Sequence, residues 1–259
     1  MKVVILCGGR GTRLREETEF RPKPMVPIGG KPILWHIMKT YAAQGFREFV
    51  LCLGYKGDMI KEYFRNYMWN TCDVTLSLGK TPSFEYHTNH EEEHWRVTLV
   101  DTGLDSLTAR RIKLIQPYIE PSKPFLLTYG DGVSNIDVAK SIQSHKDSGK
   151  ALTLTAVRPA GRFGALIIED DGNIKHFMEK PQHENVHVNG GFMVASHEIF
   201  DYLTDDNIMF EQEPIQNLVK DGKVNSFPHE GFWQPMDTYQ ESQYLNKLWA
   251  AGNAPWKLW

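Results

Sequence analysis

A short apolar run at the start of the chain, Val3 to Leu6, ends in a loop with three glycines within the four residues 8 to 11. The run predicts a buried strand, because consecutive aliphatic residues bounded by glycine suit a strand covered on both faces. Glycines let the backbone approach a ligand closely, so that successive N–H groups can converge on an anion. Two cations, Arg13 and Lys23, follow the loop. The pattern therefore predicts a phosphate site at the end of a strand.

Two better-known glycine-rich loops do not fit this stretch. The dinucleotide fingerprint G-x-G-x-x-G needs glycine or alanine where Leu14 stands, and no acid closes a second strand about 20 residues later. The ATPase-type loop needs a hydroxyl after Gly30 and Lys31, where the chain has Pro32. An ordinary glycine turn is the remaining alternative. The density of glycines, Thr12 and cations in this stretch argues against it.

Apolar, strand-like runs alternate with helical patterns over the first 157 residues. Strands are predicted at 49–53, 74–78, 125–129 and 151–157, and helices at 32–45, 58–69, 110–119 and 137–145. This alternation is typical of a doubly wound α/β fold, Rossmann-like, with a mostly parallel sheet covered on both faces.

The second half of the chain has a different pattern. The runs 165–169 and 174–179 flank an Asp-Asp-Gly turn and predict an antiparallel insertion. With no Ser/Pro-rich linker, we expect one domain over 1–259. Its last helix, about 238–251, leads into a tryptophan-rich tail that packs either on the body or in a subunit interface.

Charge and cysteine content limit the partners. The net charge of −3 gives no general attraction to nucleic acid or to an anionic membrane, so phosphate binding has to be local. The three cysteines are far apart and odd in number, which indicates free thiols in a reducing compartment. No stretch resembles a signal peptide or a membrane span. We expect a cytoplasmic protein with no membrane or nucleic-acid partner.

Two carboxylates stand where a ligand is expected. Asp131 follows the apolar run 125–129 between two glycines, and Asp237 comes late in the chain, just before a helix. Ligands of open α/β sheets lie beyond the carboxyl ends of the strands. Two carboxylates together with substrate phosphate oxygens suit Mg²⁺. Taken alone, Asp237 fits an N-cap equally well.

Together these segments resemble the sugar-phosphate nucleotidyltransferases. That family carries G-G-x-G-T-R-L, K-P-M and G-x-K-P near its N-terminus, a G-D at a parallel strand end and a second Asp late in the chain, all present here in order. An E-K-P segment at 179–181, an N-G-G at 189–191 and an F-G at 163–164 extend the match.

The resemblance implies a set of site residues. It implies that Arg13, Lys23 and Asp131 are catalytic and that Asp131 and Asp237 bind Mg²⁺. The implied nucleotide-binding residues are Leu6, Cys7, Gly8, Gly9, Arg10, Gly11, Thr12, Arg13, Lys23, Ser106, Thr108, Arg111 and Gly130. The implied sugar-phosphate residues are Gly164, Glu179, Lys180, Asn189 and Gly190.

The base-reading segment departs from the Q-x-x-P-x-G of the thymidylyl and uridylyl enzymes. Its V-D-T-G opening at 100–103, together with the segments 232–238 and 254–257, resembles the cytidylyltransferase branch acting on glucose 1-phosphate. That branch implies CTP and glucose 1-phosphate as substrates and Mg²⁺-dependent in-line transfer. Arg111 can donate to O2 and N3 of cytosine. Which of Ser106, Thr108 and Arg111 reads the base stays open.

Several alternatives remain. The same chemistry could use UTP or dTTP. A non-catalytic homologue that binds nucleotide sugars would keep the fold but lose charged site residues, and these are present. A glycosyltransferase, which also binds nucleotide sugars, would need a D-x-D motif at a strand end, and none stands at a predicted strand end here. The His/Glu-rich stretch 85–94 is expected to be a solvated loop, with zinc binding as the lesser alternative. The family resemblance also implies a homo-oligomer.

Overall fold

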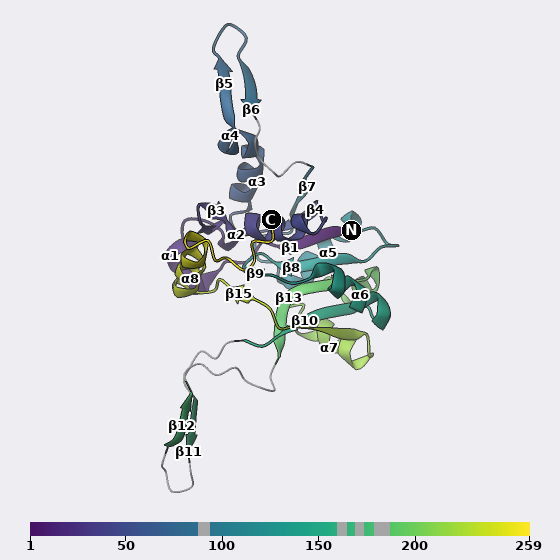
Figure 1. The fold of residues 1–259 in the computed structure, drawn as a ribbon. Helices are drawn as coiled ribbons and strands as arrows, with labels where there is room; N and C mark the ends of the chain where they lie inside the picture. Colours follow the sequence, from purple (N-terminus) through teal and green to yellow (C-terminus); the bar gives the residue numbers. More distant parts are fainter. Residues whose placement is uncertain (88–93, 160–164, 169–173, 179–186) are drawn as a thin grey trace.

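A seven-stranded sheet forms the centre of the computed structural model, which describes residues 1–87, 94–159, 165–168, 174–178 and 187–259 (Figure 1). The strand order is β14-β10-β13-β8-β1-β4-β7. β13 runs antiparallel to β8 and β10, and the other neighbours are parallel. The doubly wound, mostly parallel fold expected from the sequence is confirmed. The strands are β1 (Lys2–Leu6), β4 (Glu48–Leu53), β7 (Arg96–Asp101), β8 (Phe125–Tyr129), β10 (Leu152–Val157), β13 (Val188–Ala195) and β14 (Val224–His229).

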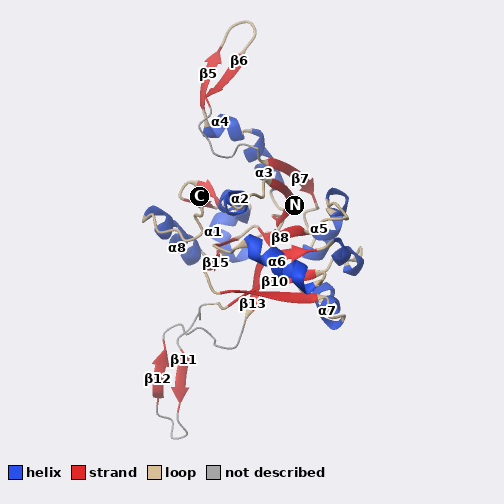
Figure 2. Cartoon of the chain, turned by 45° about the vertical axis from the view of Figure 1, so that its right-hand side comes forward, coloured by secondary structure: helices blue, strands red, loops and turns tan. Residues whose placement is uncertain are grey.

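Helices cover both faces of this sheet, as Figure 2 shows. The α-helices are α1 (Arg15–Thr18), α2 (Ile33–Ala43), α3 (Gly57–Arg65), α4 (Tyr67–Thr71), α5 (Thr108–Leu114), α6 (Val138–Ser148), α7 (Glu213–Lys220) and α8 (Tyr239–Ala250). α2, α3, α6 and α8 pack their apolar residues on one face, and α5 and α7 pack on the other. β1 supplies both cores, because alternate residues point to opposite faces of a strand: Val3 and Ile5 lie in the first core and Val4 and Leu6 in the second.

The strand predicted at 74–78 is present, but its expected place in the central sheet is wrong. Residues Asp73–Ser77 form β5, which pairs with β6 (Ser83–His87) in a separate antiparallel hairpin that projects from the body (Figure 1). The parallel neighbour of β4 is instead β7, which the sequence analysis did not predict. β7 is an edge strand with only Val100 fully buried, so it lacks the continuous apolar run that marks an inner strand.

Other sequence-based boundaries hold with small changes. The predicted helix at 58–69 is interrupted at Asn66, which separates α3 from α4. The predicted hairpin in the second half is confirmed as β11 (Ala165–Ile168) paired with β12 (Ile174–Met178). None of the helices in the described part of the chain has the length and apolar run needed to cross a membrane.

The C-terminal segment folds back onto the first core. The Trp256 side chain is fully buried, and its indole N–H lies 3.3 Å from Nδ1 of His36 on α2. His36 Nε2 lies 2.8 Å from the carbonyl oxygen of Ile28. Trp249 and Trp259 pack against the same imidazole. The tryptophans of the tail therefore pack on the body of the same chain, the first of the two alternatives considered for them.

Two small two-stranded sheets complete the fold. β2 (Pro27–Ile28) pairs with β3 (Lys31–Pro32). β9 (Gly132–Ser134) pairs with β15 (Trp233–Pro235), with Gly132 opposite Pro235. The second pairing joins the segment just after Asp131 to the segment just before Asp237. It therefore brings together two acids that are far apart in the sequence.

Candidate active site

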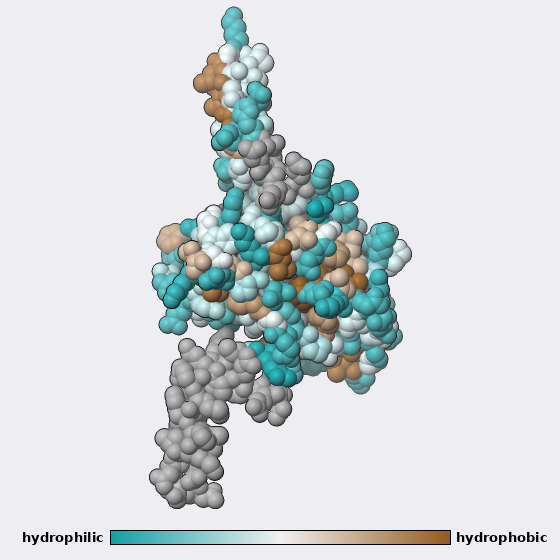
Figure 3. Space-filling model, in the orientation of Figure 1, coloured by the Kyte–Doolittle hydropathy of each residue, from teal (hydrophilic) through white to brown (hydrophobic). Residues whose placement is uncertain are grey.

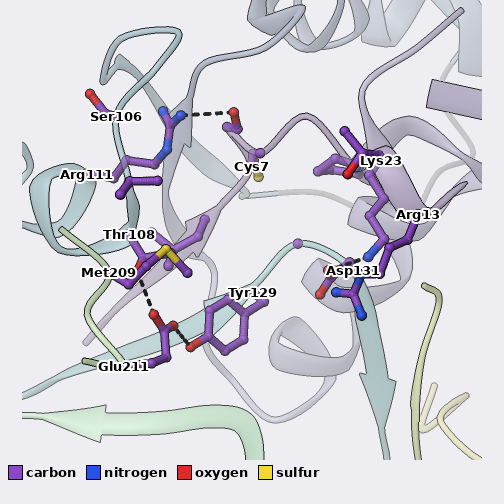
Figure 4. A pocket seen from close by; sticks show the side chains of 18 residues that line it. Cys7, Arg13, Lys23, Ser106, Thr108, Arg111, Tyr129, Asp131, Met209 and Glu211 are labelled. Carbon is purple, nitrogen blue, oxygen red and sulfur yellow. Dashed lines mark hydrogen bonds and ion pairs between the residues drawn. The ribbon is translucent and has the colours of Figure 1, made fainter. Parts of the chain in front are cut away.

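The loops that leave the carboxyl ends of β1, β7 and β8 meet at one edge of the sheet, where open α/β folds hold their ligands. Together with the segment before α7 they enclose a cavity of about 380 Å³ (Figure 4). Its lining residues are Leu6, Cys7, Gly8, Gly9, Gly11, Thr12, Arg13, Lys23, Pro24, Ser106, Leu107, Thr108, Arg111, Tyr129, Gly130, Asp131, Met209 and Glu211. Every residue of the predicted nucleotide-binding set lines this cavity except Arg10.

Arg10 lies outside the cavity lining. Its guanidinium forms an ion pair with Asp105 at 2.7 Å, and both side chains are exposed. The contact links the glycine-rich loop after β1 to the loop between β7 and α5. Exposed ion pairs contribute little stability, so this contact only weakly restrains the two loops.

A compact network of two acids and two cations lies at one end of the cavity. Arg13, Lys23 and Asp131 line the cavity, and Asp237 is outside its lining but contacts both cations. Lys23 Nζ lies 2.7 Å from Asp131 Oδ2 and 2.5 Å from Asp237 Oδ1. Arg13 Nη1 lies 2.7 Å from Asp237 Oδ2. The lysine side chain is 9% exposed, whereas that of Arg13 is 67% exposed. The four formal charges cancel.

Local structure fixes each member of this network. Lys23 begins the short 3₁₀ turn Lys23–Met25, and Asp131 lies in the two-residue link between β8 and β9. The backbone N–H of Met236 donates to the carbonyl oxygen of Asp131 at 2.8 Å, which continues the β9–β15 pairing up to the acids.

A capping box at the start of α8 holds the backbone of Asp237. Glu241 Oε2 accepts from the N–H groups of Asp237 and Thr238, at 2.7 and 2.8 Å, and the Thr238 hydroxyl accepts from the N–H of Glu241. Asp237 itself is not the cap, because Thr238 takes the N-cap position.

The two carboxylates fit a divalent cation. A positive group, the Lys23 ammonium, already stands between their oxygens, and both offer the hard oxygen ligands that Mg²⁺ prefers. Within the described residues, no group of three or more His, Cys, Asp or Glu side chains could hold a metal. An ion held by two acids alone depends on phosphate oxygens and water for its other ligands.

Arg111 forms the floor at the other end of the cavity. Its Nη1 and Nη2 atoms donate to the carbonyl oxygens of Gly8, Leu53, Gly103 and Leu104 and to the Thr102 hydroxyl, at 2.7 to 3.3 Å. Burial lowers the pKa of this guanidinium. The carbonyl oxygens around it accept its hydrogen bonds in place of water. The hydrogen bonds of the Arg111 guanidinium thus join the loops after β1 and β7 to the end of β4.

Two glycines make room for that guanidinium. A Cβ added at Gly8 would lie 2.2 Å from Arg111 Cζ, and one added at Gly54 would lie 2.5 Å from Nη1. No side chain larger than hydrogen fits at either position without moving Arg111. Glycine at these two positions is therefore needed for packing on the arginine.

The segment that precedes α7 closes the cavity beside Arg111, and the sequence analysis did not find it. Glu211 accepts from the hydroxyls of Tyr129 and Thr108, the latter at 2.7 Å, and Met209 lines the wall (Figure 4). The Thr108 hydroxyl also accepts from the N–H of Phe210. Thr108 thus joins α5 to this wall, and its hydroxyl is engaged within the protein. No local pattern marks these residues, since their place follows from the chain return after β13.

The sugar side is described in part. Asn189 and Gly190 stand at the start of β13, where Asn189 Oδ1 accepts from the N–H of Gly191 at 2.9 Å and the Gly190 carbonyl accepts from Trp233 Nε1 at 2.7 Å. The ring of Tyr129, which lines the cavity, lies against Gly191. The predicted residues Gly164, Glu179 and Lys180 lie outside the described residues.

The stretch 85–94, predicted to be a solvated loop, begins within a strand, because its first residues Glu85–His87 belong to β6 and pair with β5. His87 Nε2 is 2.8 Å from the Thr75 hydroxyl across the hairpin, on an exposed surface. His90 and the three glutamates lie outside the described residues.

A family model decides what kind of protein carries this site. The model described as "Nucleotidyl transferase" matches residues 2–246. The chain belongs to the nucleotidyl transferase family. The glucose-1-phosphate cytidylyltransferase of Salmonella typhi is 49% identical over 259 residues, which cover 100% of both chains. A probable glucose-1-phosphate cytidylyltransferase of Bacillus subtilis is 47% identical, again over 100% of both. The resemblance found in the sequence is therefore confirmed at full length.

Solved structures agree on the fold of this nucleotidyl transferase. HddC from Yersinia pseudotuberculosis superposes with a TM-score of 0.70 at 25% identity, over 96% of this chain and 99% of the other. The α/β architecture and the mixed, mostly parallel sheet are thus those of the family.

Proposed function

We propose that this nucleotidyl transferase moves CMP from CTP to α-D-glucose 1-phosphate and releases pyrophosphate and CDP-glucose. The observation that carries the proposal is the full-length 49% identity to an enzyme of that name. The cavity supports it, because cations and acids gather at one end and a donor-rich floor lies at the other.

The reaction asks the protein for positioning and for charge stabilisation. A phosphate oxygen of the sugar phosphate attacks the α-phosphorus in line, and pyrophosphate leaves, with no covalent intermediate on the protein. The backbone of Gly8 to Gly11 would hold the nucleotide. Arg13 and Lys23 would neutralise charge on the triphosphate as pyrophosphate leaves. Lys180 would orient the attacking phosphate, and Glu179, Gly164, Asn189 and Gly190 the sugar.

Asp131 and Asp237 would hold Mg²⁺. Bound there together with substrate phosphates, the ion would offset negative charge at the reacting groups. For this to happen, Lys23 has to exchange its two carboxylate partners for phosphate oxygens.

Base recognition is proposed for the Arg111 end of the cavity. Nη1 and Nη2 of Arg111 are engaged by loop carbonyls, so the arginine acts on the base chiefly by shaping the floor beneath it. Ser106 also lines this end, and its hydroxyl can donate or accept. Thr108, whose hydroxyl is bound to Glu211, would support the wall.

We also propose that copies of the chain associate. The β5–β6 hairpin carries apolar side chains outward, with Leu78 83% and Phe84 56% exposed, and Figure 3 shows a hydrophobic patch on the projecting hairpin. Exposed apolar patches on a strand pair mark contact surfaces.

Free cysteines, two of them buried, support a reducing compartment such as the cytoplasm.

The decisive experiment compares nucleotides. Pyrophosphate release is measured with glucose 1-phosphate and Mg²⁺ for CTP, UTP, dTTP and ATP, and we expect the highest kcat/KM with CTP. Preference for UTP or dTTP would refute the cytidylyl assignment and leave the chemistry intact. Absence of turnover with all four, while nucleotide sugar still binds, would support the non-catalytic alternative.

A further inference from the structure

Lys23 occupies the place between the two acids that a metal ion would need. Its ammonium contacts one oxygen of Asp131 and one of Asp237, at 2.7 and 2.5 Å, and its side chain is 9% exposed. A divalent cation that approached these carboxylates would meet a positive charge already in contact with both of them. Like charges at such distances repel strongly when water is largely excluded.

From this geometry we infer that Lys23 closes the Asp131–Asp237 pair to metal ions in the free protein, so that the metal enters only together with a nucleoside triphosphate. The inference rests on the proposed function, in which the two acids hold Mg²⁺. It defines the form of the substrate at this site, namely the metal–nucleotide complex rather than a metal ion followed by nucleotide.

The charge balance explains why the closure can be reversed. Arg13, Lys23, Asp131 and Asp237 sum to zero, so the empty cavity has little net attraction for a bare cation. A triphosphate carries several negative charges and offers Lys23 oxygen acceptors of the same kind as the carboxylates. Once Lys23 pairs with phosphate, the two acids are left with their negative charges free for a cation.

The number of protein ligands points the same way. In the described ranges, no group of three or more metal-ligating side chains is found. Mg²⁺ usually binds proteins through one or two carboxylates plus substrate phosphates and retains several waters. Two acids held by a lysine are therefore a poor site for the bare ion and a suitable one for an ion that brings phosphate oxygens with it.

Arg13 provides a matched control for Lys23. It is also a cation in contact with Asp237, but it touches only one of the acids, and its side chain is 67% exposed. Its removal leaves Lys23 between the carboxylates. If closure depended on net positive charge alone, both cations would matter equally.

The test measures the Mn²⁺ retained by the protein in equilibrium dialysis, with nucleotide on both sides of the membrane where it is added, and in the absence of glucose 1-phosphate so that no turnover occurs. We expect wild type to bind Mn²⁺ only when CTP is added, or UTP should CTP fail to bind. Lys23→Met should bind Mn²⁺ without nucleotide, at least about tenfold more tightly than wild type. In the absence of nucleotide, Arg13→Met and Lys23→Arg should leave Mn²⁺ unbound, as wild type does, because each keeps a cation between the carboxylates, and Lys23→Met/Asp131→Asn should lose the binding gained by Lys23→Met.

The outcomes separate this inference from the proposed function. Stoichiometric Mn²⁺ binding by wild type without nucleotide, abolished by Asp131→Asn, would overturn the inference and leave the proposed reaction intact. Failure of folded Lys23→Met to take up Mn²⁺ would also overturn it. Lack of Mn²⁺ binding by wild type even with nucleotide would remove both the inference and the metal from the proposed function. If Lys23→Met fails to fold, Mn²⁺ binding by wild type or by Lys23→Arg without nucleotide would still overturn the inference.

Discussion

The guanidinium of Arg111 donates a hydrogen bond to the carbonyl oxygen of Gly8 at 3.0 Å, across 103 positions of sequence. The same guanidinium would collide with any Cβ at Gly8, whereas a Cβ at the neighbouring Gly9 would meet nothing within 4 Å. Two adjacent glycines of one loop thus have different roles. Gly8 makes room for the arginine, and Gly9 faces open space.

This difference predicts that Gly8→Ala weakens nucleotide binding far more than Gly9→Ala. The added methyl at Gly8 would push Arg111 away from the loop carbonyls, and overpacking of this kind costs about 1–3 kcal/mol. We expect at least about a tenfold rise in the nucleotide dissociation constant, which corresponds to about 1.4 kcal/mol. Titration calorimetry on both variants tests this, and equal affinities for the two would contradict the packing role of Gly8.

Asp131→Asn should lower kcat by roughly a hundred- to a thousandfold, because one charged group that stabilises the reacting phosphates is lost. The fold should persist, since the Asp131 side chain is 32% exposed and asparagine keeps its shape. Steady-state kinetics and a thermal melt give the two readouts. Asp105→Asn serves as a control, as it removes only an exposed ion pair with Arg10. Full activity of Asp131→Asn would exclude this residue from the site.

Glu241→Ala should impair catalysis through the position of Asp237. The lost acceptor leaves the N–H groups of Asp237 and Thr238 unpaired, which should lower the free energy of unfolding by about 1 kcal/mol. It should also raise the Mg²⁺ concentration needed for half-maximal rate. Glu241→Gln keeps an acceptor oxygen and should restore the Mg²⁺ dependence. A variant that loses stability but responds normally to Mg²⁺ would limit Glu241 to capping.

Acid should weaken the docking of the C-terminal tail through His36. Burial lowers the pKa of His36 to about 4, from about 6.5 in the unfolded chain. The unfolded state therefore binds more protons between these values, and stability should be complete above pH 6.5 and fall as the pH drops towards 4, by about 3 kcal/mol. The imidazole contacts agree, since a proton on Nδ1 would face the indole N–H of Trp256.

Denaturation curves between pH 7 and pH 4 test the His36 prediction. His36→Gln, which cannot take up a proton, should flatten the slope in this window even if the variant is less stable overall. An unchanged slope would show that other groups cause the acid sensitivity.

Local sequence was enough to predict most of the strands and the chemistry at their ends. β8 and β4 follow from short apolar runs, and Arg13 and Asp131 stand near glycine-rich turns that occur where such strands end. The period of side-chain burial and the turn residues are properties of neighbouring positions, so they are legible without a fold. The branch of the family was readable as well, from the segment that contains Arg111.

Sequence patterns were insufficient wherever a residue's role depends on distant pairing. The apolar residues of β5 suit a sheet strand, yet β5 lies in the projecting hairpin, and β7, with a similar mix of apolar and polar residues, completes the sheet. Likewise, Thr108 seemed suited to reading a base, but its hydroxyl is bound to Glu211, more than a hundred positions away. Strand partners and buried hydrogen bonds are selected by the whole packed structure, which a local pattern does not contain.

By itself, the sequence determined that this chain carries a glycine-rich loop at a strand end, two cations and two acids, and that it belongs to the nucleotidyl transferase family. The tertiary structure decided how these charges meet. The β9–β15 pairing carries Asp237 to Asp131, and the turn at Lys23 inserts an ammonium between them. Residue types and spacing encode which charges are present. Only the closure of long loops in a partly buried cavity makes them pair, because there each charge requires a partner.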